Sequence, residues 1–148
     1  MAVVDFERLS DALSASGKVG DLDTASILIT VDGEGYPFVC MLSSRQLTVR
    51  GRQLVALVQS RRTIANLERG GRAALHLVHN DASLLARLQM HSTRTTDDQT
   101  LFFFEVSTLE SERRSTILMP ITYQLDEEIL AREGLTIQEI VGQLDGCD

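Results

Sequence analysis

Between residues 25 and 125 the chain consists largely of short segments in which apolar and polar residues alternate, separated by turn-forming residues. Alternation with a period of two is typical of β-strands that bury one face. Glycine-containing turns at 32–35 and 51–52 separate two pairs of these segments, because glycine allows the positive φ angles that tight turns require. The pattern predicts strands over residues 25–31, 36–43, 45–50, 54–58, 72–78, 82–91, 101–106 and 117–125.

Helical periodicity is found near both ends of the chain and once in the middle. Residues 4–15 and 61–69 each place apolar residues three or four positions apart, as amphipathic helices do. After residue 125 the sequence predicts a short acidic helix over 126–134 and a second helix over 136–144, which opens with a capping box. Segment 82–91 contains many helix-forming residues, but its alternation favours a strand.

Many antiparallel strands joined by tight turns suit a closed or partly closed barrel, because closure hides the strand edges. The predicted fold is therefore mainly β, of the α+β kind: a barrel of about six to seven antiparallel strands with flanking helices. The 148 residues are expected to form one domain, 1–148. Its core is predicted over about residues 22–125, followed by C-terminal helices over 126–145.

Composition places the chain among ordinary globular proteins, since 43% of its residues are hydrophobic and 24% are charged. No apolar run approaches the roughly 20 residues needed to cross a membrane. Acids interrupt residues 1–7, which argues against a signal peptide. Cys40 and Cys147 lie far apart and have no metal-binding spacing. These features predict a protein of the reducing cytoplasm without membrane contact.

One stretch, residues 54–67, combines an apolar strand, a polar and basic corner and the start of a short helix. Ser60 can cap this helix by accepting a backbone N–H of its first turn, and Arg61 and Arg62 follow directly. Arginines beside the positive end of a helix form a favourable site for a phosphate or another anion.

The charge distribution supports such a site. Residues 45–72 contain seven arginines and one acid, a net charge of +6, so with −7 for the whole chain the remainder carries −13. This asymmetry favours one anionic ligand site on an otherwise acidic protein. The alternative is a solvated arginine face without a ligand. The negative total argues against nucleic acid as a partner, because binding to nucleic acid depends on positive charge.

The order of these segments resembles the pyridoxamine 5′-phosphate oxidase-like split barrels, which bind flavin. The resemblance runs roughly from Ala25 to Val78, over a third of the chain. The polar-basic corner and the strand after it are more specific at this spacing than the first hairpin alone. The segments that carry the resemblance are Ile27–Pro37, Leu54–Leu57, Ser60–Leu67 and Gly71–Leu75.

This resemblance implies a split β-barrel homodimer that holds FMN in a groove at the dimer interface. The FMN phosphate would lie at the corner, and the isoalloxazine ring would lie along the strand over residues 39–43. The resemblance implies no metal site and assigns no catalytic residue. It assigns cofactor binding to Cys40, Met41, Leu42, Ser43 and Ser44 of the strand and its end, and to Ser60, Arg61, Arg62, Thr63 and Asn66 of the corner.

Two departures from that family bear on the function. Thr63 stands where many relatives have a lysine, so one phosphate contact would come from a hydroxyl. The chain has no Trp, and it ends in an acidic helix instead of the arginine-and-histidine substrate motif of the true oxidases. An FMN-dependent oxidoreductase with a different small-molecule substrate therefore fits better than a pyridoxamine-phosphate oxidase. An obvious acid, base or nucleophile is not required, because a flavin carries hydride chemistry itself.

The alternative is a flavin- or haem-binding protein without turnover, a sensor or carrier, with deazaflavin or haem in place of FMN. A haem-binding barrel needs a histidine ligand, and His76, His79 and His91 are the only histidines of the chain. His76 and His79 are three positions apart, so on a strand they point to opposite faces and do not form a metal-binding pair.

A homodimer is also predicted from the sequence itself. In the segment Leu101–Phe104 both faces of the expected strand are apolar. A small barrel has one inside, so outward aromatic residues need a cover, and a twofold contact with a second copy is the commonest cover.

Overall fold

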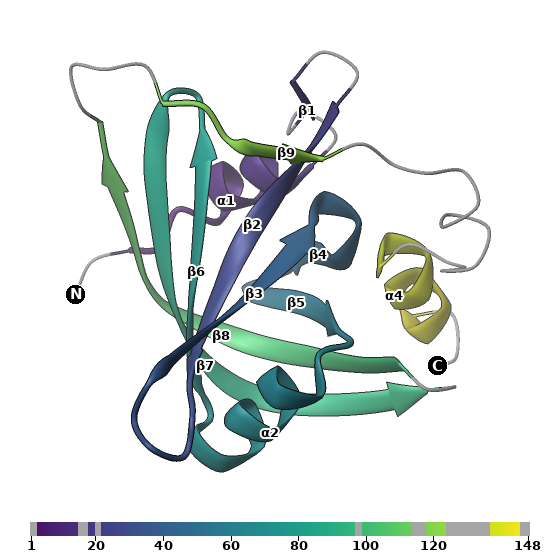
Figure 1. Cartoon of the computed structure of the whole chain (residues 1–148). Coiled ribbons are helices and arrows are strands. Elements are labelled where there is room, and N and C mark those ends of the chain that lie inside the picture. Colours follow the sequence, from purple (N-terminus) through teal and green to yellow (C-terminus); the bar gives the residue numbers. More distant parts are fainter. Residues whose placement is uncertain are drawn as a thin grey trace.

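The computed structural model describes residues 3–14, 18–19, 22–96, 99–113, 118–123 and 137–145. Within these ranges one sheet of nine strands is accompanied by α-helices and one 3₁₀ helix (Figure 1). The elements in chain order are α1 (Phe6–Leu13), β1 (Lys18–Val19), β2 (Leu22–Val31), β3 (Pro37–Ser43), η2 (Ser44–Gln46), β4 (Leu47–Arg50), β5 (Gln53–Val58), α2 (Arg61–Gly70), β6 (Arg72–His79), β7 (Ala82–Thr96), β8 (Gln99–Glu112), β9 (Ile121–Tyr123) and α4 (Ile137–Asp145).

All pairs of strands in the sheet are antiparallel, and the sheet curls into an incomplete barrel. Its order is β3, β2, β6, β7, β8, β5, β4, with the short β1 and β9 added to β2. β3 and β4 follow one another in the chain through η2, yet among the described residues they form no ladder with each other. The barrel is therefore split between β3 and β4, which confirms the predicted split-barrel class.

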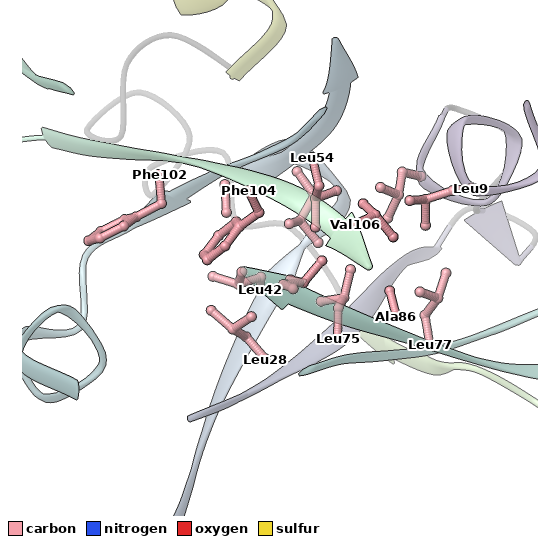
Figure 2. Close-up of a cluster of buried hydrophobic side chains, with 14 of the residues drawn as sticks. Leu9, Leu28, Leu42, Leu54, Leu75, Leu77, Ala86, Phe102, Phe104 and Val106 are labelled. Atoms are coloured by element: carbon pink, nitrogen blue, oxygen red, sulfur yellow. The ribbon is translucent and has the colours of Figure 1, made fainter. Parts of the chain in front are cut away.

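Alternate residues of strands β2 to β8 fill the barrel interior, and Figure 2 shows several of them. Leu28, Leu75 and Phe104 are fully buried there, and Leu9 of α1 packs against the same cluster. The rings of Phe102 and Phe104 stack with centroids 6.1 Å apart. Burying a large apolar side chain stabilises the fold by roughly 1.5–3 kcal/mol, so this cluster is the main source of stability of the strand framework.

A second apolar cluster lies on the outer face of β5 and β8. Val55, Leu57, Leu101 and Phe103 are buried there beneath three residues of α4, which lies beside these strands in Figure 1. The cover is made by Ile137, Ile140 and Val141. The expectation that a second copy covers the outward residues of 101–104 is thus wrong, because the chain covers them with its own C-terminal helix. The homodimer itself stays a prediction.

Most predicted elements are confirmed, with changes at their ends. The segment predicted as a strand over 45–50 begins with η2, because Ser43 and Gln46 form a capping box that turns the backbone. The ambiguous segment 82–91 is a strand and continues to Thr96, held on both sides by β6 and β8. Of the strand predicted over 117–125, the described part forms β9 at 121–123.

The predicted helix over 126–134 lies outside the described residues, as does the start of the one over 136–144. The rest of that last helix is α4, which confirms a helix there. None of the helices in the described part of the chain is long and apolar enough to cross a membrane.

Two adjacent glycines lie at the end of α2, and they differ in backbone conformation and in the space around them. Gly71 has φ of 71°, its N–H donates to the carbonyl of Leu67 at 2.8 Å, and a Cβ added to it would lie 3.1 Å from Nε2 of Gln89. Gly70 has no positive φ, and a Cβ added there meets nothing within 4 Å. Gly71 is therefore required by the backbone, whereas Gly70 is not.

We expect Gly71→Ala to lower the free energy of unfolding by at least about 1 kcal/mol, because a left-handed residue with a Cβ is strained. Gly70→Ala is expected to raise it by roughly 0.4–1 kcal/mol, since alanine restricts the unfolded chain. Urea unfolding of the two variants measures both changes. Equal effects of the same sign would contradict the geometry at this helix end.

Candidate functional site

The predicted polar-basic corner is the N-terminus of α2, as expected. Ser60 is the N-cap, and its Oγ accepts a hydrogen bond from the backbone N–H of Thr63 at 3.3 Å. The hydroxyl of Thr63 also donates to Ser60 Oγ, at 3.1 Å. The serine oxygen is thus engaged within the helix end, where it holds the first turn in shape.

Arg61 and Arg62 occupy the first turn of α2 and are both exposed. The guanidinium carbon of Arg62 lies 5.4 Å from the centre of the Phe38 ring, a cation–π contact that links α2 to β3. Arg61 has no ion-pair or ring partner among the described residues. The first N–H groups of a helix have no partner inside the helix, so two guanidinium groups and backbone donors are available to an anion at this end.

Thr63 and Asn66, the other two corner residues, are buried, at 0% and 6% exposure. Asn66 Nδ2 donates to Thr30 Oγ1 of β2 at 3.0 Å, and Asn66 Oδ1 accepts from a terminal nitrogen of Arg69 at 2.9 Å. Arg69 also donates to the carbonyl of Val31 at 2.9 Å. The bonds of Asn66 and Arg69 fasten α2 to the end of β2, and the side chains of Thr63 and Asn66 lie beneath the surface of the corner.

Asp32 shapes the β2–β3 turn next to this helix. Its Oδ1 accepts from the backbone N–H of Tyr36 and of Glu34, both at 2.9 Å. The N–H of Tyr36 is the main reason that the pKa of Asp32 is lowered; partial desolvation opposes it, and the N–H of Glu34 and the charges of Arg69 and Arg62 lower it further. Arg62 and Arg69 therefore lie within electrostatic range of the Asp32 carboxylate, and Arg61 is not among the charges that act on it.

We expect Asn66→Ala to lower the free energy of unfolding by about 1–3 kcal/mol, because it removes a bond to the buried Thr30 hydroxyl and another to Arg69. Glu68→Ala, an exposed change on the same helix, is the control and should stay within about 0.5 kcal/mol of the parent. Chemical unfolding measures both. If Asn66→Ala matched the control, the Asn66 network would contribute nothing to the docking of α2.

The five strand residues expected to bind the cofactor lie along β3 and in η2. Leu42 is buried in the core, Cys40 is partly buried, and Met41 is 56% exposed. Ser43 Oγ accepts from the N–H of Arg45 at 3.2 Å, while the Ser43 N–H donates to Gln46 Oε1 at 2.9 Å. Ser44 opens η2 and is partly exposed. The hydroxyl of Ser43 is therefore occupied locally, and Leu42 offers a ligand only its backbone.

The structure brings the corner to the beginning of β3, through the contact of Arg62 with Phe38. Ser43 and Ser44 lie at the opposite end of that strand. Between the two ends, β3 has one edge paired with β2, and its other edge faces the split in the barrel. An unpaired strand edge presents backbone N–H and C=O groups that hydrogen-bond a planar polar partner. The corner and the pair Ser43 and Ser44 thus lie at the two ends of this unpaired edge.

Sequence reasoning missed Arg69 and Phe38, which organise this site. Arg69 was counted among the surface arginines, yet it joins α2 to β2. Its position three residues after Asn66, on the same face of the helix, was the available signal. Phe38 gave no signal, because its contact with Arg62 depends on how α2 packs on the hairpin.

Two of the three histidines have a polar partner. His76 Nε2 lies 2.7 Å from Ser83 Oγ, and His91 Nδ1 lies 3.4 Å from Glu105 Oε1. Within the described ranges no three His, Cys, Asp or Glu residues come together in a way that could hold a metal ion. None of the three histidines is among the residues expected to bind the cofactor, so the haem alternative, which needs a histidine ligand, is not favoured.

The comparisons with known proteins agree with the fold. No protein-family model and no curated protein matches the chain. One similar solved structure is a protein from Clostridium acetobutylicum that is related to general stress protein 26 of B. subtilis and belongs to the pyridoxinephosphate oxidase family. It has a TM-score of 0.56 at 18% sequence identity, and the alignment covers 82% of this chain and 96% of that chain. The styrene monooxygenase flavin reductase from Pseudomonas putida S12 has a TM-score of 0.52 at 15% identity, and the alignment covers 62% of this chain and 81% of that chain. An F420 reductase has a TM-score of 0.51 at 14% identity, and the alignment covers 61% of this chain and 91% of that chain.

At these low identities the likeness establishes the fold alone. The chain has the split β-barrel architecture of the pyridoxamine 5′-phosphate oxidase-like proteins, and the resemblance expected from residues 25–78 is confirmed at that level.

Proposed function

We propose that the protein binds FMN and acts as a flavin-dependent oxidoreductase on a small-molecule substrate. The observation that carries this proposal is the pair Arg61 and Arg62, exposed on the first turn of α2 beside the open edge of β3. Two structural neighbours are named as reductases of flavin or F420, which supports a flavin-type cofactor. The setting proposed is the cytoplasm, where the free thiol of Cys40 stays reduced.

The residues of the corner fit a phosphate group, but only two of the five residues expected to contact it would do so. Arg61 and Arg62 would hold the phosphate together with backbone N–H groups, because they combine positive charge with unpaired donors. Ser60, Thr63 and Asn66 keep the helix end in shape through their own hydrogen bonds. The missing family lysine at position 63 is consistent with this, since the buried Thr63 side chain does not reach the surface.

The ring system would lie along β3, whose open edge offers backbone hydrogen bonds to its polar side. Met41 and Val39, at 56% and 54% exposure, would supply apolar contact. The bound flavin supplies the hydride transfer, so the chain needs to bind and orient it and to limit the access of water.

We also propose a homodimer, now on a different surface from the one first expected. Val39, Met41, Val31 and Ile121 expose apolar side chains on the outer side of the β2–β3 hairpin and β9. Exposed apolar residues that gather on one sheet face are typical of protein interfaces. Light scattering of the parent and of Met41→Glu tests this. A dimer mass that falls to a monomer mass in the variant supports it, and a monomeric parent at micromolar concentration rejects it.

The absorbance spectrum of the purified protein, followed by titration with FMN, riboflavin, F420 and haemin, tests the cofactor. We expect saturable binding of FMN, tighter than that of riboflavin, because riboflavin lacks the phosphate. Tighter binding of F420 would favour the second candidate, a deazaflavin-dependent protein, which the F420 reductase neighbour suggests. A Soret band with haemin and no flavin binding would overturn the proposal.

A further inference from the structure

A cavity of about 440 Å³ opens on the outward face of the sheet, across β2, β6, β7 and β8. None of the ten residues expected to bind the cofactor lines it. Its apolar floor includes Ile29 and Ala74, which are register partners on β2 and β6. Their neighbours Leu28 and Leu75 are buried in the barrel core, so strand alternation turns Ile29 and Ala74 outward.

The short side chain of Ala74 creates the hollow. Ala74 pairs with Ile29 on one side and with Arg87 on the other, and both partners have much longer side chains. A small residue between long ones on one sheet face leaves a depression with raised walls. A cavity of this size and lining is in the range of small-molecule sites.

Two arginines stand at this depression. Arg87 is the register partner of Ala74, and Arg72 lies two positions before Ala74 on β6, so Arg72 and Arg87 are diagonal neighbours. Diagonal neighbours are roughly 7–8 Å apart at the backbone, within reach of long side chains. Both line the cavity and both are exposed.

Glu110 on β8 is a diagonal neighbour of Arg87, but it does not line the cavity. The cavity has no acidic residue in its lining, and neither arginine has an ion-pair partner in the described part of the chain. Glu105, on the neighbouring β8, lies against His91 instead. An anion bound between two arginines would be attracted by both charges.

A bulge adds a hydroxyl group next to Arg87. Arg87 pairs with Thr108 and Leu88 pairs with Val106, so Ser107 is an extra residue on β8. Bulges redirect side chains and are frequent beside binding sites. Ser107 lines the cavity, where it can donate a hydrogen bond to an anion.

We propose that this cavity binds a small molecule with a flat apolar body and one anionic group, a carboxylate or a phosphate. The body lies on Ile29 and Ala74, and the anionic group lies between Arg72 and Arg87. The inference is independent of the flavin proposal, because the cavity shares no residue with the corner or with the cofactor-binding part of β3.

The test uses two-dimensional amide NMR of the full chain, titrated with 1-naphthoate, 1-naphthyl phosphate and the uncharged 1-naphthalenemethanol. We expect both anions to shift the amide signals of Ala74, Arg87 and Ser107. Arg72→Gln and Arg87→Gln should each weaken the anions by about fivefold, the size expected for an exposed charge pair, and leave the alcohol unchanged. Arg94→Gln is the matched control, since Arg94 is exposed on the same strand but does not line the cavity.

Ala74→Leu fills the hollow and should weaken all three probes, while the spectrum of each variant reports whether the fold is kept. Tighter binding of the phosphate than of the carboxylate, or the reverse, identifies which anion the site prefers. Unshifted amide signals at these three residues would overturn the proposal. A second copy that covers the cavity would also leave these signals unshifted, and the proposal would be overturned in that case too. Equal weakening by Arg94→Gln, or equal weakening of the alcohol by Arg87→Gln, would also overturn it.

Discussion

Replacing Arg61 by alanine is expected to weaken FMN binding by about tenfold to a hundredfold and to leave riboflavin binding nearly unchanged. A hydrogen bond to a charged group contributes roughly 1.5–3 kcal/mol, and Arg61 has no competing partner in the described structure. Arg62→Ala should also weaken FMN, but by less, because Arg62 already contacts Phe38 and lies near Asp32. Fluorescence titration of both flavins against the parent and both variants measures these differences.

Arg52→Ala is the matched control, because Arg52 belongs to the same basic stretch but stacks on Phe6 of α1. It should bind both flavins as the parent does. Thermal unfolding without ligand should show little change for Arg61→Ala, since exposed arginines contribute little to stability. Equal losses for FMN and riboflavin, or no loss in either corner variant, would show that the phosphate binds elsewhere.

The second large effect concerns the outer face of β8. We expect Phe103→Ala to lower the free energy of unfolding by about 3–5 kcal/mol, the usual cost of truncating a buried phenylalanine. Phe103 is 7% exposed because α4 of the same chain covers it, with Ile137, Ile140 and Val141 in the same cluster. Since α4 belongs to the same chain, Phe103→Ala should lower the free energy of unfolding by the same amount at low and high protein concentration.

Urea unfolding at two concentrations that differ a hundredfold checks this expectation. Glu105→Ala, an exposed change on the same strand, serves as the control and should have only a small effect. A loss that appears only at high concentration would mean that a second copy, and not α4, covers Phe103.

Much of the fold follows from local pattern, and the rest depends on pairings between distant segments. The hairpin of β2 and β3 and the end of α2 were predictable because turn residues and capping residues act within a few positions. The pairing of β2 with β6 joins Ile27 to His76, and no local signal specifies such a partner. The cover of Phe103 by α4 was missed for the same reason: apolar residues on two faces predict a cover but do not say which segment supplies it.

The candidate site was predictable to a similar degree. Ser60, Arg61 and Arg62 are at a helix start as the sequence indicated. The burial of Thr63 and Asn66 was not predictable, because both are polar and their hydrogen bonds depend on the position of β2. The cavity at Ala74 was also invisible to sequence, since it arises from three side chains on neighbouring strands.

The position of β5 in the sheet has a consequence for how the protein is made. Leu54–Val58 are five consecutive buried residues, and their ladder on one side is formed by β8, with Leu54 opposite Phe104 about fifty residues later in the chain. At a synthesis rate of about 5–20 residues per second, this strand waits roughly 3–10 s for its partner. Its outer face waits longer still, because α4 is made after β8. During translation the apolar β5 is thus expected to stay without its β8 partner for seconds, whereas β6 and β7 can pair as soon as both leave the ribosome.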